Sequence, residues 1–418
     1  MTAAPLNQVL RHPDNCCTAL DEWLSGDGGK GLEIALRDPS TLIPTIKAAG
    51  LRGLGGSGFP AYRKWEMIAA QPQTGDRYLI CNGNEDEPGT FKDRLLLEES
   101  PHQIIEGALI CALATNINHI IFYINPHLKC ATETLSAAMT QWQQSEYLQQ
   151  ISEQLGADEL ALKITPSPGH YIAGEETAAI EAVEGHFPFP RGKPPYPAIA
   201  GVHGKPTLIN NIETLANVSH IVRNGAEWFQ SLGNDGCSGT KIYCVSGDVA
   251  FAGAYELPLG STLESLIFQH AGGISGNRKL KAVFTGGPSN SILTADELHV
   301  ALDFDSLKQQ QAALGTGAMI VVAEGNPIIP HIAEYLNFFA SASCGQCPPC
   351  TSGTREMARL TRKIAAGEGR AGDLESLISL SEMLPGSGRC HLVDGAVTVL
   401  KSSLNHFRTE YQQALVRK

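Results

Sequence analysis

Long apolar runs and an excess of positive charge are both missing from this sequence of 418 residues. No uninterrupted apolar stretch reaches the roughly 20 residues that a membrane-spanning helix needs. The chain has 31 lysines and arginines against 43 aspartates and glutamates, a formal net charge of -12. This balance argues against nucleic acid as a partner, because phosphate binding needs clustered basic side chains. The N-terminus, MTAAPLNQVLRHPDNCC, lacks a basic start followed by an apolar block, so we expect no signal peptide.

Internal repeats and low-complexity tracts are also absent. The 11 cysteines are spread through a chain too long to resemble a secreted disulfide framework. We therefore expect a cytoplasmic protein with reduced thiols and a metal site. A hydrophobic content of 43% with 18% charged residues is typical of a globular protein, and the length predicts two or three domains.

The first half of the chain has the pattern of a parallel α/β sheet. Residues 1–50 are predicted to be helical, and from 51 onward short apolar strands alternate with helical patterns. The expected order is a strand at 77–83, a helix at 102–116, a strand at 119–125 and a helix at 131–151. Around 190–205 the chain is rich in proline and glycine, which excludes regular structure and indicates a linker or a binding loop.

The second half changes character twice. Four strand-like runs, at 240–247, 253–260, 279–287 and 317–323, surround one expected helix at 261–272, which indicates a small α+β domain. From 328 onward the strand patterns stop. Four amphipathic helices are predicted at 332–343, 355–367, 373–384 and 395–415, and they form a small bundle.

Three cysteines at strict intervals of three residues lie in the stretch SASCGQCPPCTSG. Cys344, Cys347 and Cys350 open the second helix of the bundle, and Cys390 follows 40 residues later between the third and fourth helices. Two antiparallel helix hairpins bring this junction back beside the triplet. Cubane iron–sulfur clusters commonly take three local cysteines and one distant one. The alternatives are zinc, whose usual pattern is two separated pairs, and structural cysteines. For the other seven cysteines we expect core positions.

Glycine and acidic residues mark a second candidate site. The stretch GLRGLGGSGFPAYRKW contains five closely spaced glycines, and such loops let backbone N–H groups reach a phosphate. It does not have the standard dinucleotide-binding spacing, and alone it is weak evidence. The acidic loop CNGNEDEPGTFKDR follows a strand, and YIAGEETAAIEAVEG places Glu175 and Glu176 where a helix begins, which is consistent with a ligand-facing loop.

These three stretches, together with KPPYPA, LINNIETLANV, DFDSL and SCGQCPPC, resemble the NADH-oxidising flavoprotein subunit of respiratory complex I. The diaphorase subunits of NAD-linked formate dehydrogenases and hydrogenases belong to the same family. The resemblance runs from about residue 45 to 410. It implies an N-terminal helical segment (1–50), an FMN-binding parallel α/β domain (51–235), a small ubiquitin-like α+β domain (236–327) and a C-terminal four-helix bundle with one [4Fe-4S] cluster (328–418).

The resemblance also implies the site residues and the partners. FMN contacts are expected at Gly53, Gly55, Lys64, Asn82, Tyr171, Gly174, Glu175, Asn210, Asn211 and Thr214. NADH-facing residues are expected at Phe59, Lys64, Glu87, Glu176, Lys193 and Tyr196, and the cluster ligands are Cys344, Cys347, Cys350 and Cys390. The implied activity is hydride exchange between NAD(H) and FMN, after which single electrons leave through the cluster. The implied partners are a thioredoxin-like [2Fe-2S] subunit and a larger iron–sulfur or catalytic subunit.

The sequence departs from the family pattern at four positions. The family usually has arginine at Leu54, aspartate at Asn84, an aromatic residue at Met67 and cysteine at Ala173. These changes leave an alternative open: an electron-relay or structural subunit that no longer binds nicotinamide. A zinc-stabilised scaffold is a third hypothesis. The carboxylates of Glu87 and Glu176 favour NAD(H) over NADP(H), because they would repel a 2′-phosphate.

Overall fold

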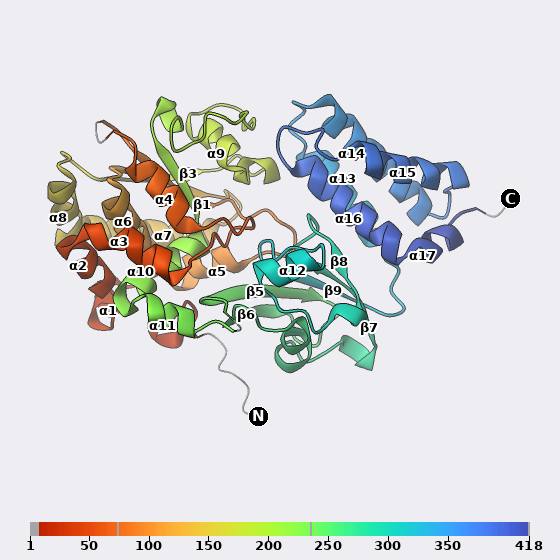
Figure 1. The fold of residues 1–418 in the computed structure, drawn as a ribbon, viewed down its shortest axis with the longest axis horizontal. Helices are drawn as coiled ribbons and strands as arrows, with labels where there is room; N and C mark the ends of the chain where they lie inside the picture. The colour runs from red at the N-terminus through yellow and green to blue at the C-terminus, as the bar shows by residue number, and fades with distance from the viewer. Residues whose placement is uncertain (1–7, 73–74, 235, 417–418) are drawn as a thin grey trace.

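The chain folds into three regions that follow one another along the sequence, from red to blue in Figure 1. The structure is a computed structural model, and it describes residues 8–72, 75–234 and 236–416. An α/β region comes first, a second sheet follows, and helices alone make up the C-terminal region. This order agrees with the fold class predicted from the sequence.

A four-stranded parallel sheet organises the first region. Its order is β3-β2-β1-β4, with β1 Tyr78–Gly83, β2 His119–Ile124, β3 Ala161–Pro166 and β4 Thr207–Asn211. Ligands bind beyond the carboxyl ends of the strands in open α/β sheets. Here β1 ends at the acidic loop, and β4 ends at Asn210 and Asn211. The sheet therefore brings two of the predicted motifs to one edge.

Helices pack around this sheet and share one core with the N-terminal segment. Trp23, Leu32 and Ile46 from the N-terminal helices belong to the same buried cluster as Ile104 and Leu109. The helices of this region are α1 Leu20–Ser25, α2 Lys30–Arg37, α3 Leu42–Ala49, α4 Ala61–Ala69, α5 Lys92–Glu99, α6 Pro101–Thr115, α7 Lys129–Gln143, α8 Glu146–Leu155, α9 Glu176–Val183, α10 Ile212–Asn224 and α11 Ala226–Ser231. Helix α6 is buried along almost its whole length, which explains its nearly continuous apolar sequence.

The expected helix at 131–151 is instead two helices, α7 and α8, which meet at Ser145. The Ser145 hydroxyl donates to the carbonyl of Trp142 at 2.6 Å, and the Ser145 backbone is extended. Serine competes with helical hydrogen bonds in this way, which favours a break. The last predicted helix also divides, at Phe407, into α16 Leu392–His406 and α17 Arg408–Gln413.

A mixed five-stranded sheet forms the second region, in the order β6-β5-β9-β7-β8. The four predicted strands are present as β5 Thr240–Gly247, β6 Gly253–Pro258, β7 Leu280–Thr285 and β9 Ala318–Ala323, and a short β8, Ile292–Leu293, joins them. Only β5 and β9 pair in parallel within this sheet of the described chain. A π-helix at Ser265–His270 occupies the expected helix position, and α12 is Phe304–Gln309.

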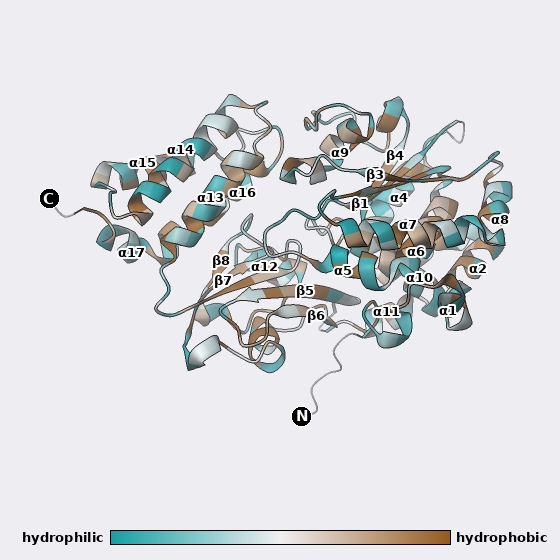
Figure 2. Ribbon diagram, turned by 180° about the vertical axis from the view of Figure 1, so that it is seen from behind, coloured by the Kyte–Doolittle hydropathy of each residue, from teal (hydrophilic) through white to brown (hydrophobic). Residues whose placement is uncertain are grey.

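The C-terminal helices are α13 Ile329–Ala342, α14 Pro348–Ala365, α15 Ala371–Met383, α16 and α17. Their core continues onto the second sheet through Phe284 and Ile292. Figure 2 shows hydrophobic residues concentrated on the strands, whereas α14 and α15 mix hydrophilic and hydrophobic positions. Among residues 8–416, apart from the short gaps in the description, no helix is long and apolar enough to cross a membrane.

The described chain also contains short 3₁₀ helices, at Pro13–Asn15, Pro39–Thr41, Tyr171–Gly174, Val202–Gly204, Ser275–Asn277 and Ala295–Glu297. The proline-rich segment around 190–205 contains no other regular element, as its composition predicts. It borders the cavity described next.

Candidate functional site

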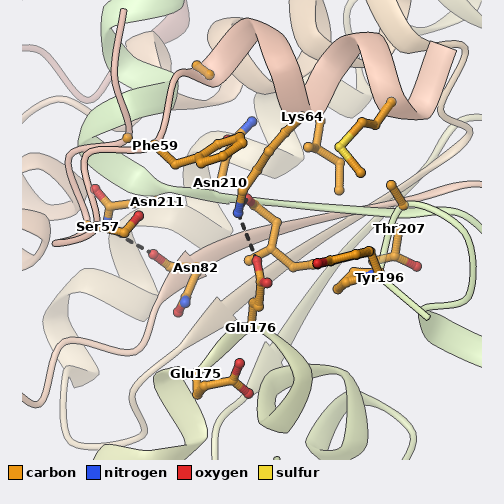
Figure 3. Close-up of a pocket in the computed structure, with 18 of the residues that line it drawn as sticks. Ser57, Phe59, Lys64, Asn82, Glu175, Glu176, Tyr196, Thr207, Asn210 and Asn211 are labelled. Carbon is orange, nitrogen blue, oxygen red and sulfur yellow. Dashed lines mark hydrogen bonds and ion pairs between the residues drawn. The ribbon is translucent and has the colours of Figure 1, made fainter. Parts of the chain in front are cut away.

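A cavity of about 680 Å³ lies at the carboxyl ends of β1 and β4 (Figure 3). Most of the residues that the sequence assigns to cofactor and nucleotide line it: Gly53, Gly55, Phe59, Lys64, Asn82, Gly174, Glu175, Glu176, Lys193, Tyr196, Asn210 and Asn211. They come from five separate stretches of the chain, which the parallel sheet brings together. Ser57 and Thr207 also line the cavity, although the sequence did not assign them to either ligand, and so does Met67, where the family usually has an aromatic residue.

The glycine-rich loop forms one wall of this cavity. The Gly53 N–H donates to the Phe59 carbonyl at 2.8 Å and closes the loop on itself. A Cβ at Gly55 would lie 2.9 Å from the Cβ of Asn211, so only glycine lets the loop approach β4 this closely. The wall therefore presents backbone rather than side chains, which is the arrangement that a phosphate-bearing ligand needs.

Thr214 differs from its predicted role. It is buried on α10 and lies outside both cavities of the site. Its hydroxyl oxygen accepts a hydrogen bond from the Leu54 N–H at 2.9 Å. Thr214 therefore supports the glycine-rich loop from beneath, and the buried Leu54 side chain leaves no guanidinium at the position where the family usually has arginine.

Four charged side chains meet at the mouth of the cavity. The Glu176 carboxylate accepts from Lys64 Nζ at 2.8 Å and from Lys193 Nζ at 2.5 Å, and Lys193 also reaches Glu175 at 3.3 Å. Burial alone would raise the pKa of Glu176, but the two lysines lower it to about 2. Glu175 is the N-cap residue of α9, and its other oxygen accepts from the Thr177 and Ala178 N–H groups. Glu176 is thus ionised, and its charge is compensated.

Two aromatic side chains stand exposed at the same mouth. Phe59 and Tyr196 are 39% and 49% exposed, which leaves a face of each ring free for a planar ligand. Met67 lines the cavity beside them and is 37% exposed. A thioether can pack against an aromatic ring, so the chain keeps an apolar surface here despite the loss of the aromatic residue usual in the family.

A second cavity of about 670 Å³ adjoins the first, and the two share Gly55, Ser57, Asn82, Gly174, Glu175, Lys193 and Asn211. Tyr171 and Glu87 line this second cavity. The Tyr171 hydroxyl donates to Glu87 at 2.6 Å, and the Ser289 N–H donates to the other Glu87 oxygen at 3.1 Å. Burial raises the pKa of Glu87. Glu87 therefore lines a different cavity from Phe59 and Tyr196, whereas the resemblance implies that all three face the nucleotide.

Asn84 stands in the acidic loop at a position where the family usually has aspartate, and it also lines the second cavity. Its amide nitrogen donates to Asp86 at 3.0 Å and to the His170 carbonyl at 3.2 Å, and its amide oxygen accepts from Ser167. The amide thus joins the acidic loop to the segment that precedes Tyr171. Aspartate would lose both donations, so asparagine fits the contacts present in this chain. The fourth departure, Ala173, is fully buried.

The four predicted cluster cysteines line one small cavity at the N-terminal end of α14. Cys344, Cys347, Cys350 and Cys390 share it with Ile172, Pro190 and Leu392. Burial and the neighbouring thiols raise the pKa of Cys390 to about 11, and burial also raises that of Cys350. The Arg389 N–H donates to the Cys347 sulfur at 3.3 Å. An apolar wall, four cysteines that line one cavity and an N–H donor fit a cluster, whose iron would displace the thiol protons.

Cys390 connects the cysteine site to the second cavity. It lines both the second cavity and the cysteine cavity, as do Ile172, Arg389 and Leu392. Tyr171 lies on the same path, with its ring packed edge-on against Phe338 at a centroid distance of 5.0 Å. The first cavity, the second cavity and the cysteine site are therefore continuous neighbours.

An α/β domain with a glycine-rich loop, joined to a four-cysteine site on helices, is the arrangement expected of a flavin-containing iron–sulfur oxidoreductase. Comparison with known proteins agrees. Residues 46–220 match the family model described as the Nuo51 FMN-binding domain, and residues 331–414 match the NADH-ubiquinone oxidoreductase-F iron-sulfur binding region.

Relatives match over nearly the whole chain. The second F-type subunit of the NADH-quinone oxidoreductase of Rhizobium meliloti (strain 1021) is 40% identical over 94% of this chain and 93% of its own length. The F-type subunit of the Escherichia coli (strain K12) enzyme is 37% identical over 98% of this chain and 93% of its own. A solved NAD+-reducing [NiFe]-hydrogenase chain, in the H2-reduced state, is 34% identical with a TM-score of 0.86, covering 99% of this chain and 68% of that chain.

The protein belongs to the family of F-type subunits of NADH-quinone oxidoreductase. It is an oxidoreductase subunit of the kind that carries FMN and a [4Fe-4S] cluster and takes NADH as substrate. These findings confirm the family, the activity and the cofactors predicted from the sequence. The matches do not assign individual residues, whose roles remain predictions.

Proposed function

We propose that the first cavity binds FMN and the dinucleotide together, with FMN on the inner side and NAD(H) entering at the mouth. The glycine-rich loop, Asn82, Asn210 and Asn211 supply the inner polar groups, and Phe59 and Tyr196 supply the outer apolar faces. FMN held by these residues would supply hydride acceptance from NADH and one-electron release. A cluster held by the four cysteines would supply single-electron transfer to partner subunits. The observation that carries this proposal is the continuity of the three sites through residues they share.

The chain's own residues have separable tasks in this proposal. Lys64 and Lys193 hold Glu176 as a carboxylate whose position is fixed, so it can accept hydrogen bonds from ribose hydroxyls. Tyr171 and Glu87 close the side of the site that faces Cys390. Phe338 and Phe339 pack against Tyr171 and cover this passage with apolar surface.

We further propose the partners and the domain boundaries. Electrons leave to a thioredoxin-like [2Fe-2S] subunit and to a larger iron–sulfur or catalytic subunit. The change from the parallel sheet to the second sheet, and from that sheet to helices alone, supports boundaries near residues 235 and 327. The buried cores cross both boundaries, because the first core includes Ile242 and the C-terminal core includes Phe284 and Ile292. The N-terminal helices share the core of the α/β domain. We also propose a cytoplasmic location, where the four thiols that line the cysteine cavity would stay reduced.

The cluster assignment can be tested by replacing one ligand. Cys347→Ser should remove most iron and acid-labile sulfide and leave the flavin bound, because the FMN cavity lies on a different domain. The matched control is Cys130→Ser on α7, an exposed cysteine outside every cavity of the site. Iron, sulfide and flavin are measured on the purified proteins. Full iron content in the Cys347 variant would reject the assignment, as would equal losses in the control.

A further inference from the structure

A buried network of charged residues lies beneath the glycine-rich loop, outside the set of residues assigned to FMN or NADH. Lys241 of β5 and Glu213 of α10 are both fully buried, and Lys241 Nζ lies 2.8 Å from the Glu213 carboxylate. The same carboxylate oxygen lies 3.0 Å from Lys92 Nζ. Lys92 in turn contacts Asp93 at 2.7 Å. Two lysines and two carboxylates therefore balance one another in the interior.

Each end of this network reaches the FMN cavity. At one end, Lys241 Nζ donates to the Leu54 carbonyl at 3.3 Å, in the middle of the glycine-rich loop. At the other end, Asp93 accepts from the Asn211 side-chain amide at 2.6 Å, and Lys92 donates to the Asn211 side-chain oxygen at 3.2 Å. Asn211 and the glycines on both sides of Leu54 line the cavity.

The environment of Lys241 leaves it little freedom. Gly317 lies against its side chain so closely that a Cβ there would be 2.8 Å from Lys241 Cε. The Ile242 N–H donates to Glu213 at 2.8 Å, so α10 is bound to β5 at two adjacent residues. Burial alone would raise the pKa of Glu213, but Lys241 and Lys92 lower it, which keeps the carboxylate charged. Burial lowers the pKa of Lys241, and the Glu213 carboxylate opposes this lowering. A hydrogen bond from a lysine held this rigidly fixes the carbonyl that it reaches.

The second region also holds the outer side of the same loop. Arg52 donates to the Gly58 carbonyl at 2.7 Å and stacks over the Phe304 ring at 4.3 Å. Gly58 lies against that ring, where a Cβ would approach within 2.3 Å, and its φ of +62° favours glycine. The loop is therefore held between β5 and α12, both of which belong to the region with no assigned role in cofactor binding.

We propose that Lys241 is a positioning residue for FMN: it fixes the Leu54 carbonyl, and thereby the Gly53 and Gly55 backbone, in the conformation that binds the cofactor. This inference rests on the proposed FMN site. The ubiquitin-like domain then contributes to FMN affinity without contacting FMN. A purely structural role for Lys241, as the counterion of buried Glu213, is the competing explanation.

The test is FMN affinity, measured as quenching of FMN fluorescence on titration of the flavin-free protein. Lys241→Met should weaken FMN binding by about tenfold to a hundredfold, the range for loss of a hydrogen bond to a charged group. Lys281→Met is the matched control. Lys281 also joins two regions, through Glu410 at 2.5 Å, but it lies outside both ligand cavities. The control should bind FMN as the wild type does.

Two further variants separate positioning from stability. Glu213→Gln keeps Lys241 beside Leu54, so it should retain FMN affinity within about threefold even where it lowers thermal stability. Lys241→Met combined with Glu213→Gln removes one charge of each sign, so stability should recover relative to Lys241→Met alone. FMN affinity should remain low in this double variant, because the Leu54 carbonyl still lacks its donor.

Two outcomes overturn the inference: wild-type FMN affinity in the double variant, or equal affinity in Lys241→Met and the wild type. Weakened FMN binding in Lys281→Met would also count against the inference, because it would show that losing any link between two regions is sufficient to weaken FMN binding. Failure of the wild-type protein itself to bind FMN would contradict the proposed FMN site instead, so the two failures are distinguishable.

Discussion

Replacing Glu176 by glutamine should relax the choice between NADH and NADPH. Glu176 is the acidic residue most firmly bound at the cavity mouth, between Lys64 and Lys193. The lowering of its pKa from 4.5 to about 2 corresponds to about 3 kcal/mol of preferential stabilisation of the carboxylate. Removal of the charge leaves both lysines without this partner, and they become available to a 2′-phosphate.

The size of the effect follows from the exposure of the site. The Glu176 side chain is 25% exposed, so solvent screens its field and the interaction with a 2′-phosphate is that of a partly exposed pair. We expect a change of about 1 kcal/mol, or about fivefold in the ratio of kcat/KM for NADPH to that for NADH. This change in the ratio is smaller than removal of an unpaired buried carboxylate would produce, because Lys64 and Lys193 already compensate the charge of Glu176.

The assay is steady-state reduction of ferricyanide with each nucleotide. Glu66→Gln is the control: Glu66 lies on α4 two residues after Lys64, pairs with Lys47 at 3.2 Å and does not line the cavity. The control should keep the wild-type ratio. An unchanged ratio in Glu176→Gln would remove Glu176 from nucleotide selection, and a change of equal size in Glu66→Gln would show that the effect reflects net charge alone.

Two further predictions concern the buried carboxylate of Glu256 and the flavin. Glu256→Gln should destabilise the fold by about 1–3 kcal/mol in chemical denaturation. The carboxylate accepts from the N–H groups of Val9, Leu10 and Arg11, and in the variant an amide nitrogen would face one or more of these donors. Unaltered stability would show that the N-terminal segment is held by other contacts. Acid precipitation should release a yellow flavin that chromatographs as FMN, because the matched domain is an FMN-binding one; release of FAD, or retention of the flavin in the pellet, would contradict this.

Regular patterns in the sequence predicted the fold well. The strands expected at β1 and β2 and the helix expected at α6 are confirmed, because burial on both sides of an element leaves a nearly continuous apolar signal. The break at Ser145 was missed, since one serine in an amphipathic pattern does not reveal whether its hydroxyl replaces a helical hydrogen bond. The second missed break, at Phe407, has an aromatic residue at the break itself, so the amphipathic pattern marks neither break.

The site was predicted less completely than the fold. Motifs identify neighbours in sequence, but they do not say which way a side chain points. Thr214 supports the loop from beneath, and Glu87 turns toward Tyr171 rather than toward Phe59. Lys241 was missed, although a lone lysine in the apolar strand β5 is a detectable signal, because a charged residue within a buried strand needs a partner. Its partner, Glu213, lies 28 residues away and becomes visible only in the fold.

Hydride exchange between NADH and bound FMN is the activity on which the proposed roles of all these residues depend. It can be measured by adding NADH anaerobically to the purified flavin-loaded protein and following the visible absorbance of the flavin. We expect NADH to bleach the flavin, and NADPH to do so less effectively. A flavin that dithionite bleaches and NADH leaves unchanged would instead favour an electron-relay subunit, in which Leu54, Asn84 and Met67 mark the loss of nicotinamide binding.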